Sequence, residues 1–472
     1  MKPIRYVLSA WLAIIIALGS SACQGSVSLP SPSTTDEPTV TAPLAGTISP
    51  IPSPHGIPST FASIHTVPPQ ACLLADLPII SGTLWHLHRF AWSPTGDRLA
   101  YVGPAELADS PTGPLMLVAA PRFDTPQPLA PSAAGDPNWS PDGSQIAFVA
   151  FRAGDQLGTV ITVGVEGPDL RDLLPGDMAR TDPGTGYKAI DSWLDERLVV
   201  MTNCGTGCRQ PWYLDFREST MEPIFPFSPQ AVGYAWSPDR TAIVVTGGVN
   251  PQIGVILDID REISWLSGHG ALNPAWTSFW TFFADWSPDS SRFLFLCQPD
   301  NASESPELWV WNIRAGEGSP LLSGVIAARW SPRGNQIAFL TLGQPHFAPD
   351  GKLQNVAAAP QGPNSLGLGL YQYPEGRIIT FFEIGKVDWD YSALVESMQT
   401  QSLTLLWSPD GRQLVYSDGM GRAWILSVDE LSQYQVPTQR YPMDEARWSP
   451  DGRKLAITMS DRLQIFAIPC SP

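Results

Sequence analysis

The chain has 472 residues, of which 28 are Lys or Arg and 45 are Asp or Glu, so its formal net charge is −17. This balance excludes nucleic acid as an expected partner, because phosphate binding needs a concentrated basic surface. Only 15% of the residues are charged, against about 25% in a typical soluble domain, which fits an all-β body rich in turns.

The first 23 residues have the layout of a bacterial export signal. Lys2 and Arg5 precede an apolar stretch over residues 7–18, and small residues follow up to Cys23. This order predicts a secretory signal peptide at residues 1–22. The small residues before Cys23 predict lipoprotein processing, so that Cys23 becomes the lipid-modified N-terminus; simple cleavage is the alternative. We therefore expect an exported protein, anchored to the outer face of the cell membrane or located in the periplasm.

A tether follows the signal. Residues 24 to about 70 are rich in Ser, Thr and Pro and carry almost no charge. Such a segment cannot bury a core and behaves as an extended linker. The lipid-bearing Cys23 and this linker make up residues 23–70, and we expect them to hold the folded domain, residues 71–472, away from the bilayer.

The folded domain repeats one turn, which begins Trp-Ser-Pro and in most copies continues with Asp. Subtracting successive Trp positions gives intervals of 41 to 54 residues, with one of 77, and this period is typical of four-stranded propeller blades. Pro presets φ in the turn while Ser and Asp bond nearby backbone N–H groups, so each copy joins two antiparallel strands. The seven copies start at Trp92, Trp139, Trp236, Trp286, Trp330, Trp407 and Trp448, and Trp193-Leu-Asp-Glu-Arg is a worn eighth.

The residues after each turn alternate as a half-buried strand does. Leu99-Ala-Tyr-Val and Ile146-Ala-Phe-Val are examples, and a second apolar run follows in every copy. A short fourth piece, such as residues 262–266, completes a blade. We therefore predict an all-β propeller of eight four-stranded blades, with seven as the alternative. The repeated Trp is expected to fill the wedge between neighbouring blades rather than to bind a sugar or nucleotide.

This pattern resembles the TolB-type β-propeller repeat, a WD-repeat-like family marked by a Trp-Ser-Pro-Asp-Gly turn and an Ile-Ala-Phe-type strand. The resemblance covers residues 71 to 472 and implies a propeller fold. The family member that gives the repeat its name carries a globular α/β domain before its propeller. Here we expect only a signal and a tether before the first blade, so that member's partners are not carried over.

The two ends of the folded domain are predicted to meet in one sheet. The last repeat has three strands before the chain runs out, so its fourth would come from residues 73–81 near the N-terminus. Laid antiparallel to residues 463–468, that strand would bring Cys72 beside Cys470. Export permits disulfides, and we predict one between these two cysteines that locks the ring.

Three cysteines remain. Cys204 and Cys208 flank Gly-Thr-Gly, a spacing that suits a loop-closing disulfide. A zinc site is the weaker reading, because zinc needs about four ligands and no second pair lies nearby in the sequence. We expect Cys297 to be a buried strand residue rather than a nucleophile.

Catalytic motifs are sparse. The chain has no Gly-x-Ser-x-Gly elbow. His86 and His88 share one face of an expected strand, but a metal site would need further ligands from other blades. The doublets Asp258-x-Asp260 and Asp388-x-Asp390 lack the spaced oxygen ligands of a calcium loop, and we read them as turn residues. We therefore predict no metal, no cofactor and no catalytic residue.

Two regions break the repeat and are candidate binding regions. The long interval between Trp330 and Trp407 has its excess in residues 343–363 and 385–401, and the second piece contains Trp389 and Tyr391. A decorative loop is the alternative. Residues 276–286 hold six aromatics, Trp276 and Trp280 among them, which suit stacking on a sugar or an apolar peptide; blade packing is the alternative.

Three charged residues complete the candidate binding set. Asp285, Arg329 and Arg447 each immediately precede a repeat Trp, so they fall on the innermost strands and are placed to face the central channel. Their mixed signs indicate no single ligand.

We interpret the chain as a non-catalytic, monomeric binding scaffold for a protein, peptide or glycan, in contact with the membrane only through its lipid. The alternative is an enzyme, a lyase or hydrolase, that acts on extracellular carbohydrate in the axial channel. A cluster of His, Asp and Glu at one mouth of the channel would favour the enzyme. A smooth acidic or aromatic rim would favour binding.

Overall fold

The computed structural model divides into two compact units, residues 1–53 and 54–472. The residues described here all belong to the second unit: 63–80, 88–105, 110, 112–150, 158–167, 169–172, 188–194, 197–205, 208–215, 217–218, 220–225, 231–247, 253–256, 264–265, 279–299, 305–342, 346–347, 353–354, 364–387, 404–438 and 442–470. Within these ranges the secondary structure is all β, and none of it includes a helix long and apolar enough to cross a membrane.

The strands form antiparallel sheets that follow one another along the chain. The first sheet contains β3 (Phe90–Trp92), β4 (Arg98–Val102), β5 (Gly113–Ala119) and β6 (Gln127–Ala133). The second contains β7 (Gly135–Trp139), β8 (Gln145–Ala150), β9 (Thr159–Gly164) and β10 (Leu170–Asp172). An eight-stranded sheet comes next, with β11 (Lys188–Leu194), β12 (Arg197–Gly205), β13 (Cys208–Asp215), β14 (Thr220–Pro223), β15 (Ala231–Trp236), β16 (Ile243–Gly247), β17 (Ile253–Ile256) and β18 (Ser264–Trp265).

The C-terminal half continues the series. One sheet contains β19 (Phe279–Trp286), β20 (Arg292–Pro299), β21 (Glu307–Asn312) and β22 (Glu317–Ser323). The next contains β23 (Val325–Trp330), β24 (Gln336–Leu342), β27 (Asn364–Gln372) and β28 (Arg377–Val387), with β25 (His346–Phe347) and β26 (Leu353–Gln354) as a separate pair. The last two sheets are built on β29 (Leu405–Trp407), β30 (Gln413–Ser417), β31 (Ala423–Ser427) and β32 (Ser432–Gln435), and on β33 (Glu445–Trp448), β34 (Lys454–Met459) and β35 (Arg462–Ala467).

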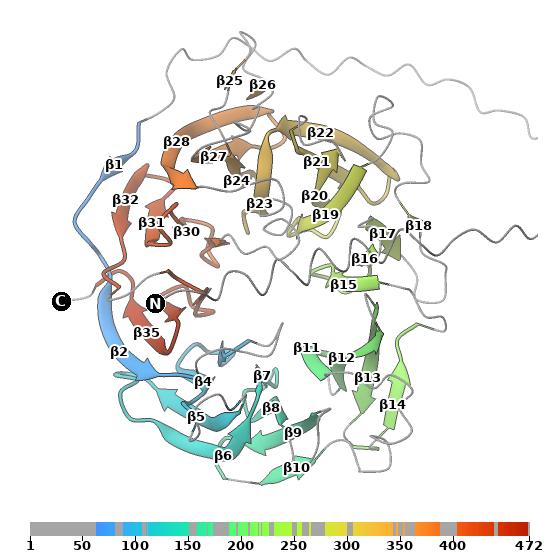
Figure 1. The fold of residues 1–472 in the computed structure, drawn as a ribbon, viewed down its shortest axis with the longest axis vertical. Helices are drawn as coiled ribbons and strands as arrows, with labels where there is room; N and C mark the ends of the chain where they lie inside the picture. The colour runs from blue at the N-terminus through green and yellow to red at the C-terminus, as the bar shows by residue number, and fades with distance from the viewer. Residues whose placement is uncertain are drawn as a thin grey trace, which may run out of the picture. The chain divides into compact units, whose positions relative to one another are not determined.

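These sheets stand around a ring (Figure 1). The Trp-bearing strands, such as β7, β15 and β23, lie on the inner side, and β6, β14 and β28 lie on the outer side. The fold is therefore a β-propeller, as the sequence pattern predicts. In the eight-stranded sheet, β13 and β15 share the single pair Arg209–Ala231, so two Trp-turn modules meet there. Divided at that pair, the described strands form seven groups of four and one group of five, in which β1 joins β29–β32, besides the pair β25 and β26; the number of blades stays a prediction.

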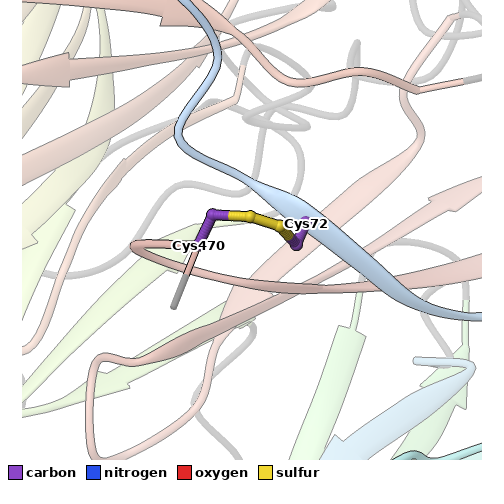
Figure 2. The surroundings of a disulfide bond; sticks show 2 residues. All are labelled: Cys72 and Cys470. Carbon is purple, nitrogen blue, oxygen red and sulfur yellow. A yellow bond between two sulfur atoms is a disulfide. The ribbon is translucent and has the colours of Figure 1, made fainter. Parts of the chain in front are cut away.

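The N-terminal segment completes the last sheet. β2 (Cys72–Pro78) pairs antiparallel with β35, from Cys72 opposite Ala467 to Pro78 opposite Arg462. This confirms the predicted closure by an N-terminal strand. Figure 2 shows the disulfide between Cys72 and Cys470, whose Cα atoms are 5.1 Å apart although 398 positions separate them in sequence.

A second contact of the N-terminal segment is not anticipated from the sequence. β1 (His65–Thr66) pairs in parallel with β32, the outer strand of the preceding sheet. The segment from β1 to β2 therefore binds the outer edges of two neighbouring sheets before the first sheet begins. Behind it, Ala75, Leu77 and Ile79 are buried in a cluster that extends through the first sheet to Trp139 and beyond.

Most of the repeat Trp residues join their own sheet to the one before it. Trp139 Nε1 donates to the carbonyl oxygen of Ala91 at 3.1 Å, and Ala91 immediately precedes Trp92. Five other repeat Trp residues donate in the same way, each to the carbonyl oxygen of the residue before the preceding repeat Trp. The pairs are Trp92 and Arg447, Trp193 and Asn138, Trp286 and Ala235, Trp407 and Arg329, and Trp448 and Leu406. The Trp side chains thus have the inter-blade role that the sequence predicts.

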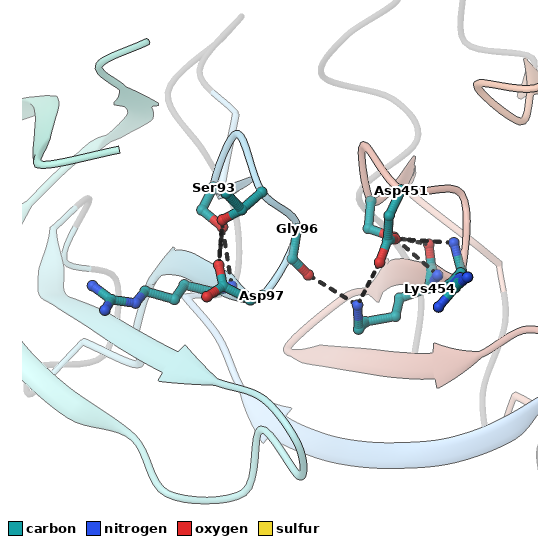
Figure 3. A network of polar contacts seen from close by, with 9 residues as sticks. Ser93, Gly96, Asp97, Asp451 and Lys454 are labelled. Carbon is teal, nitrogen blue, oxygen red and sulfur yellow. Dashed lines mark hydrogen bonds and ion pairs between the residues drawn. The ribbon is translucent and has the colours of Figure 1, made fainter. Parts of the chain in front are cut away.

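The turns explain why Ser and Asp recur after Trp. Ser140 Oγ donates to Asp142 at 2.6 Å and accepts the N–H of Gln145 at 2.9 Å. The same pair of bonds recurs in the turns that begin at Ser237, Ser287, Ser408 and Ser449. At the junction of the first and last sheets, Lys454 Nζ donates to the carbonyl oxygen of Gly96 at 3.0 Å and to Asp451 at 3.1 Å (Figure 3).

Trp330 offers a natural control for the Trp hydrogen bonds. Its buried Nε1 has no hydrogen-bond partner in the described part of the chain. We expect Trp139→Phe to lower the free energy of unfolding by about 1 kcal/mol more than Trp330→Phe does, because only the first leaves a buried carbonyl oxygen without its donor. Urea denaturation of both variants measures this difference, and equal losses would contradict the proposed role of the bond.

Candidate functional site

Strand direction defines two faces of the propeller. Each inner strand ends at its Trp and enters the Ser-Pro turn, so the turns gather on one face, which we call the turn face. The inner strands start at the opposite face, the loop face, where the connections from second to third strands and from fourth strands to the next sheet also lie. At the loop face β24 ends and β27 begins, and β28 ends before β29 begins.

Several sequence-predicted residues fall outside the described part of the chain. For Trp280, Cys204 and Cys208 the structure describes the backbone, which belongs to β19, β12 and β13, but not the side chain. The fully undescribed ones are Cys23, His86, Asp258, Asp260, Trp276, Asp388, Trp389, Asp390 and Tyr391. The predicted disulfide between Cys204 and Cys208 stays a prediction. Cys297 is a free, buried cysteine, and burial raises the pKa of its thiol, as expected for a residue that is not a nucleophile.

Asp285 and Arg329 lie where two sheets meet. Asp285 accepts the backbone N–H of Trp330 at 2.7 Å and that of Trp286 at 3.0 Å. Arg329 donates to the carbonyl oxygens of Ala284 and Ala328. Burial raises the pKa of Asp285 to about 6, although Arg329 and the two N–H groups act in the opposite direction. Through these hydrogen bonds Asp285 and Arg329 link β19 to β23.

Arg447 belongs to a group of charged side chains that the topology brings together from distant sequence positions. His88 Nδ1 lies 3.0 Å from Glu445 Oε1, and Arg447 Nε donates to the same oxygen at 2.8 Å. His88 enters the first sheet and the other two belong to β33 of the last sheet, so this contact crosses the ring closure. We call His88, Asp136, Asp191, Glu445 and Arg447 the inner-strand cluster.

Glu445 is the anion that holds the side chains of His88 and Arg447. Its side chain is 19% exposed, against 56% for His88 and 35% for Arg447. Desolvation acts to raise the pKa of Glu445, but the hydrogen bonds and charges of His88 and Arg447 outweigh it and lower that pKa. Glu445 is therefore ionised near neutral pH, while His88 and Arg447 keep exposed surface.

Asp136 ties three successive sheets together. Its carboxylate accepts the N–H of His88 at 2.7 Å and the N–H of Ile190 at 3.1 Å, and its own N–H donates to the carbonyl oxygen of His88. Its φ of 51° lies in the left-handed region, which Asp tolerates better than most residues. Burial raises the pKa of Asp136 to about 6, against the opposing effects of His88, Ile190 and Arg447.

Asp191 and Arg209 extend the charged surroundings into the eight-stranded sheet. Asp191 is exposed to solvent, yet desolvation by the surrounding protein raises the pKa of its carboxyl, with Arg240 and His88 opposing. Desolvation likewise lowers the pKa of the Arg209 guanidinium, which the charge of Asp136 opposes. His88 is therefore surrounded by carboxyl groups from three other inner strands.

Of the inner-strand cluster, the sequence pattern marks only His88 and Arg447 as candidates. Asp136, Asp191 and Glu445 are single carboxylates in different repeats, and no local motif marks them. Among the residues that the structure describes, no group of three or more His, Cys, Asp and Glu could hold a metal ion. The cluster can therefore offer hydrogen-bond donors and acceptors and a carboxylate-oriented imidazole.

Comparison with known proteins supports the fold and little else. No family model matches the chain. A segment of 230 residues is 26% identical to the uncharacterized peptidase YuxL of Bacillus subtilis (strain 168), covering 46% of this chain and 31% of that protein. The chain thus spans about a third of the length of this relative.

Solved structures of propellers cover most of the chain. The Dos1 propeller matches with a TM-score of 0.51 at 12% identity, over 83% of this chain and 95% of that one. The C-terminal WD40 domain of Sif2 matches with a TM-score of 0.48 at 12% identity, over 86% and 100% of the two chains. At this identity the Dos1 likeness shows the fold, a β-propeller, and not the function.

The raised pKa of Asp285 predicts a definite pH dependence. A carboxyl with a pKa of about 6 in the folded state and about 3.9 in the unfolded state favours folding below pH 4 and loses that contribution as the pH rises through 6. We expect wild type to lose about 2 to 3 kcal/mol of unfolding free energy relative to Asp285→Asn between pH 4 and 7.

Asp239 provides a control of opposite sign. Hydrogen bonds from Ser237 and Thr241 lower the pKa of its exposed carboxyl to about 2, so wild type should gain stability relative to Asp239→Asn as the pH rises from 2 to 5. Denaturant unfolding across the pH range measures both. A parallel pH dependence of wild type and Asp285→Asn would contradict the assignment.

Proposed function

We propose that this protein is a non-catalytic binding scaffold that recognises its ligand on the loop face of the propeller. We also propose that the repeats are of the TolB type and form eight blades, and that the chain is exported and anchored through a lipid on Cys23. The sequence of residues 1–23 supports the anchor. Recovery of wild type in the membrane fraction, and its loss in Cys23→Ala, tests this part.

The binding proposal rests on one observation: the acidic groups around the inner strands are hydrogen-bonded to the backbone of the protein itself. Both oxygens of Asp136 accept backbone N–H groups of neighbouring sheets, and one oxygen of Asp285 accepts the N–H of Trp330 in the next sheet. These carboxylates therefore stabilise the ring. His88 and Arg447 keep exposed atoms nearby, as Asp191 does, and a rigid ring holds them at fixed positions. Fixed, solvent-accessible donors on a rigid frame are what recognition requires.

The partner is a protein, a peptide or a glycan. The net charge of −17 argues against nucleic acid, whose binding depends on a concentrated basic surface. We propose a monomer whose contact with the membrane is limited to the lipid.

A second candidate is an enzyme that acts on carbohydrate or peptide within the ring. The specific observation in its favour is the pair His88 and Glu445, in which a carboxylate 3.0 Å from Nδ1 orients an exposed imidazole, as in many general bases. The relative named a peptidase points the same way. Hydrolysis or lyase activity that wild type shows and His88→Gln lacks would favour this candidate over the scaffold.

A comparison of the two faces tests the scaffold. Met420, in the connection between β30 and β31, is 59% exposed on the loop face, and Asp410 lies in the turn of the same sheet on the turn face. With a photo-reactive residue at each position in turn, we expect partner adducts from position 420 and few from position 410. Equal labelling from both positions would contradict recognition by the loop face.

A further inference from the structure

We propose that the outer edge of β32 is a binding site for an extended segment of a partner protein, and that residues 63–67 of the chain, the strap, cover this edge as a weak and releasable occupant. The strap contains β1, which lies beside β32 on the outer side of the ring (Figure 1). This surface is separate from the loop face, and the inference does not rest on the ligand proposed there.

Most outer strands of the ring are poor sites for the addition of a strand. β6, β14, β22 and β2 each contain proline, which has no backbone N–H to donate. β10 and β18 have only three and two residues. The pairing of β28 with β27 contains two register shifts, and such bulges twist an edge away from a partner. β32 contains no proline and pairs with β31 without a shift, so among the described outer strands it has a regular edge.

The backbone of the strap makes few contacts with this edge. The N–H of His65 donates to the carbonyl oxygen of Leu431 at 3.1 Å, and that of Val67 donates to the carbonyl oxygen of Gln433 at 2.8 Å. Both residues of β1 are exposed. β2, by contrast, is a strand of seven residues that the terminal disulfide fixes in place. The strap is therefore held far more weakly than the strand that closes the ring.

Two half-buried apolar side chains anchor the strap on opposite sides of the sheet. Ile64 packs against a cluster that includes Leu426 and extends into the preceding sheets. Val67 packs against a different cluster, which includes Tyr434 and extends into the last sheet. The edge thus offers an apolar contact on each side. It suits an extended segment with apolar residues three positions apart.

The prolines after the strap limit its pairing to two donors. In a parallel pair every second residue donates to the same neighbour, and His65 and Val67 are such residues. By this register, residue 69 would donate next, to the carbonyl oxygen of Gln435. Pro69 has no N–H. A partner segment with any other residue at that position would therefore add a hydrogen bond that the strap lacks.

These contacts explain why the strap is releasable. Two backbone hydrogen bonds and two half-buried side chains offset little more than the conformational entropy that the segment loses when it is ordered. The strap occupies the edge because its covalent link to β2 gives it a high local concentration. A partner segment that supplies the same apolar pair and a third donor binds by strand addition, in which the backbone gives affinity and alternate side chains give specificity.

A photo-reactive peptide tests the binding site. The peptide has the sequence of residues 63–69 with alanine in place of the last proline and benzophenylalanine in place of Thr66, which lies opposite Gln433. The released variant is Ile64→Ser/Val67→Ser. We expect at least tenfold more adducts on residues 431–435 of this variant than on wild type, counted by mass spectrometry of the digested protein. Thermal unfolding confirms that the variant is folded.

A second peptide, with serine in place of both apolar residues, is the control. It should give at least tenfold fewer adducts with the released variant. An absence of adducts on residues 431–435 of the released variant, equal adducts with the two peptides, or equal adducts in wild type and variant would overturn the proposal.

The two prolines provide a matched pair of variants for the strap itself. Pro69→Ala supplies the missing donor, so hydrogen exchange at the amides of His65 and Val67 should slow about fivefold. Pro68→Ala restores an N–H at a position that does not donate to β32, and exchange there should stay as in wild type. Exchange that is unchanged in Pro69→Ala, or that slows equally in both variants, would overturn the assigned register and with it the strap.

Discussion

The pairing of β2 with β35 is the constraint on which the other features depend. Sheets that follow one another along a chain form a closed ring only if the first and last are held together. Here the N-terminal strand supplies the outer edge of the last sheet, and the Cys72–Cys470 disulfide fixes it. Once the ring is closed, Trp92 can donate to the carbonyl oxygen of Arg447 and Lys454 to that of Gly96. These bonds repeat, across the closure, contacts of the kind made between other sheets.

The same closure creates the inner-strand cluster. His88 precedes β3, while Glu445 and Arg447 lie on β33, so they meet because the first and last sheets are neighbours. Asp136 then fixes the backbone of His88 from the second sheet. The stability of the ring and the geometry of the inner-strand cluster thus have one physical origin, and a change that opens the ring should also separate His88 from Glu445.

The repeat pattern made most of the architecture predictable. The period of the Trp residues indicates blades, Ser and Asp indicate the turns, and the missing fourth strand together with Cys72 and Cys470 indicates the closure, which the structure contains. The cluster was not predictable, because it depends on single residues in different repeats. Nothing in the sequence near Asp136 signals a carboxylate that bonds to two other sheets. The pairing of β1 was not predictable either, because its two residues are too few to show a strand pattern. Asp285 and Arg329 were expected to face the central channel. A position next to a repeat Trp also lies beside the neighbouring sheet, and both residues make hydrogen bonds to that sheet.

The most direct test of ring closure is the unfolding free energy of residues 71–472 with and without the terminal disulfide. We expect Cys72→Ala/Cys470→Ala to lower it by about 4 kcal/mol, because the bond closes a very long loop in the unfolded chain. Peptide mapping without reductant should recover Cys72 linked to Cys470. An unchanged unfolding free energy, with both cysteines found as free thiols in wild type, would contradict a ring locked by its two ends.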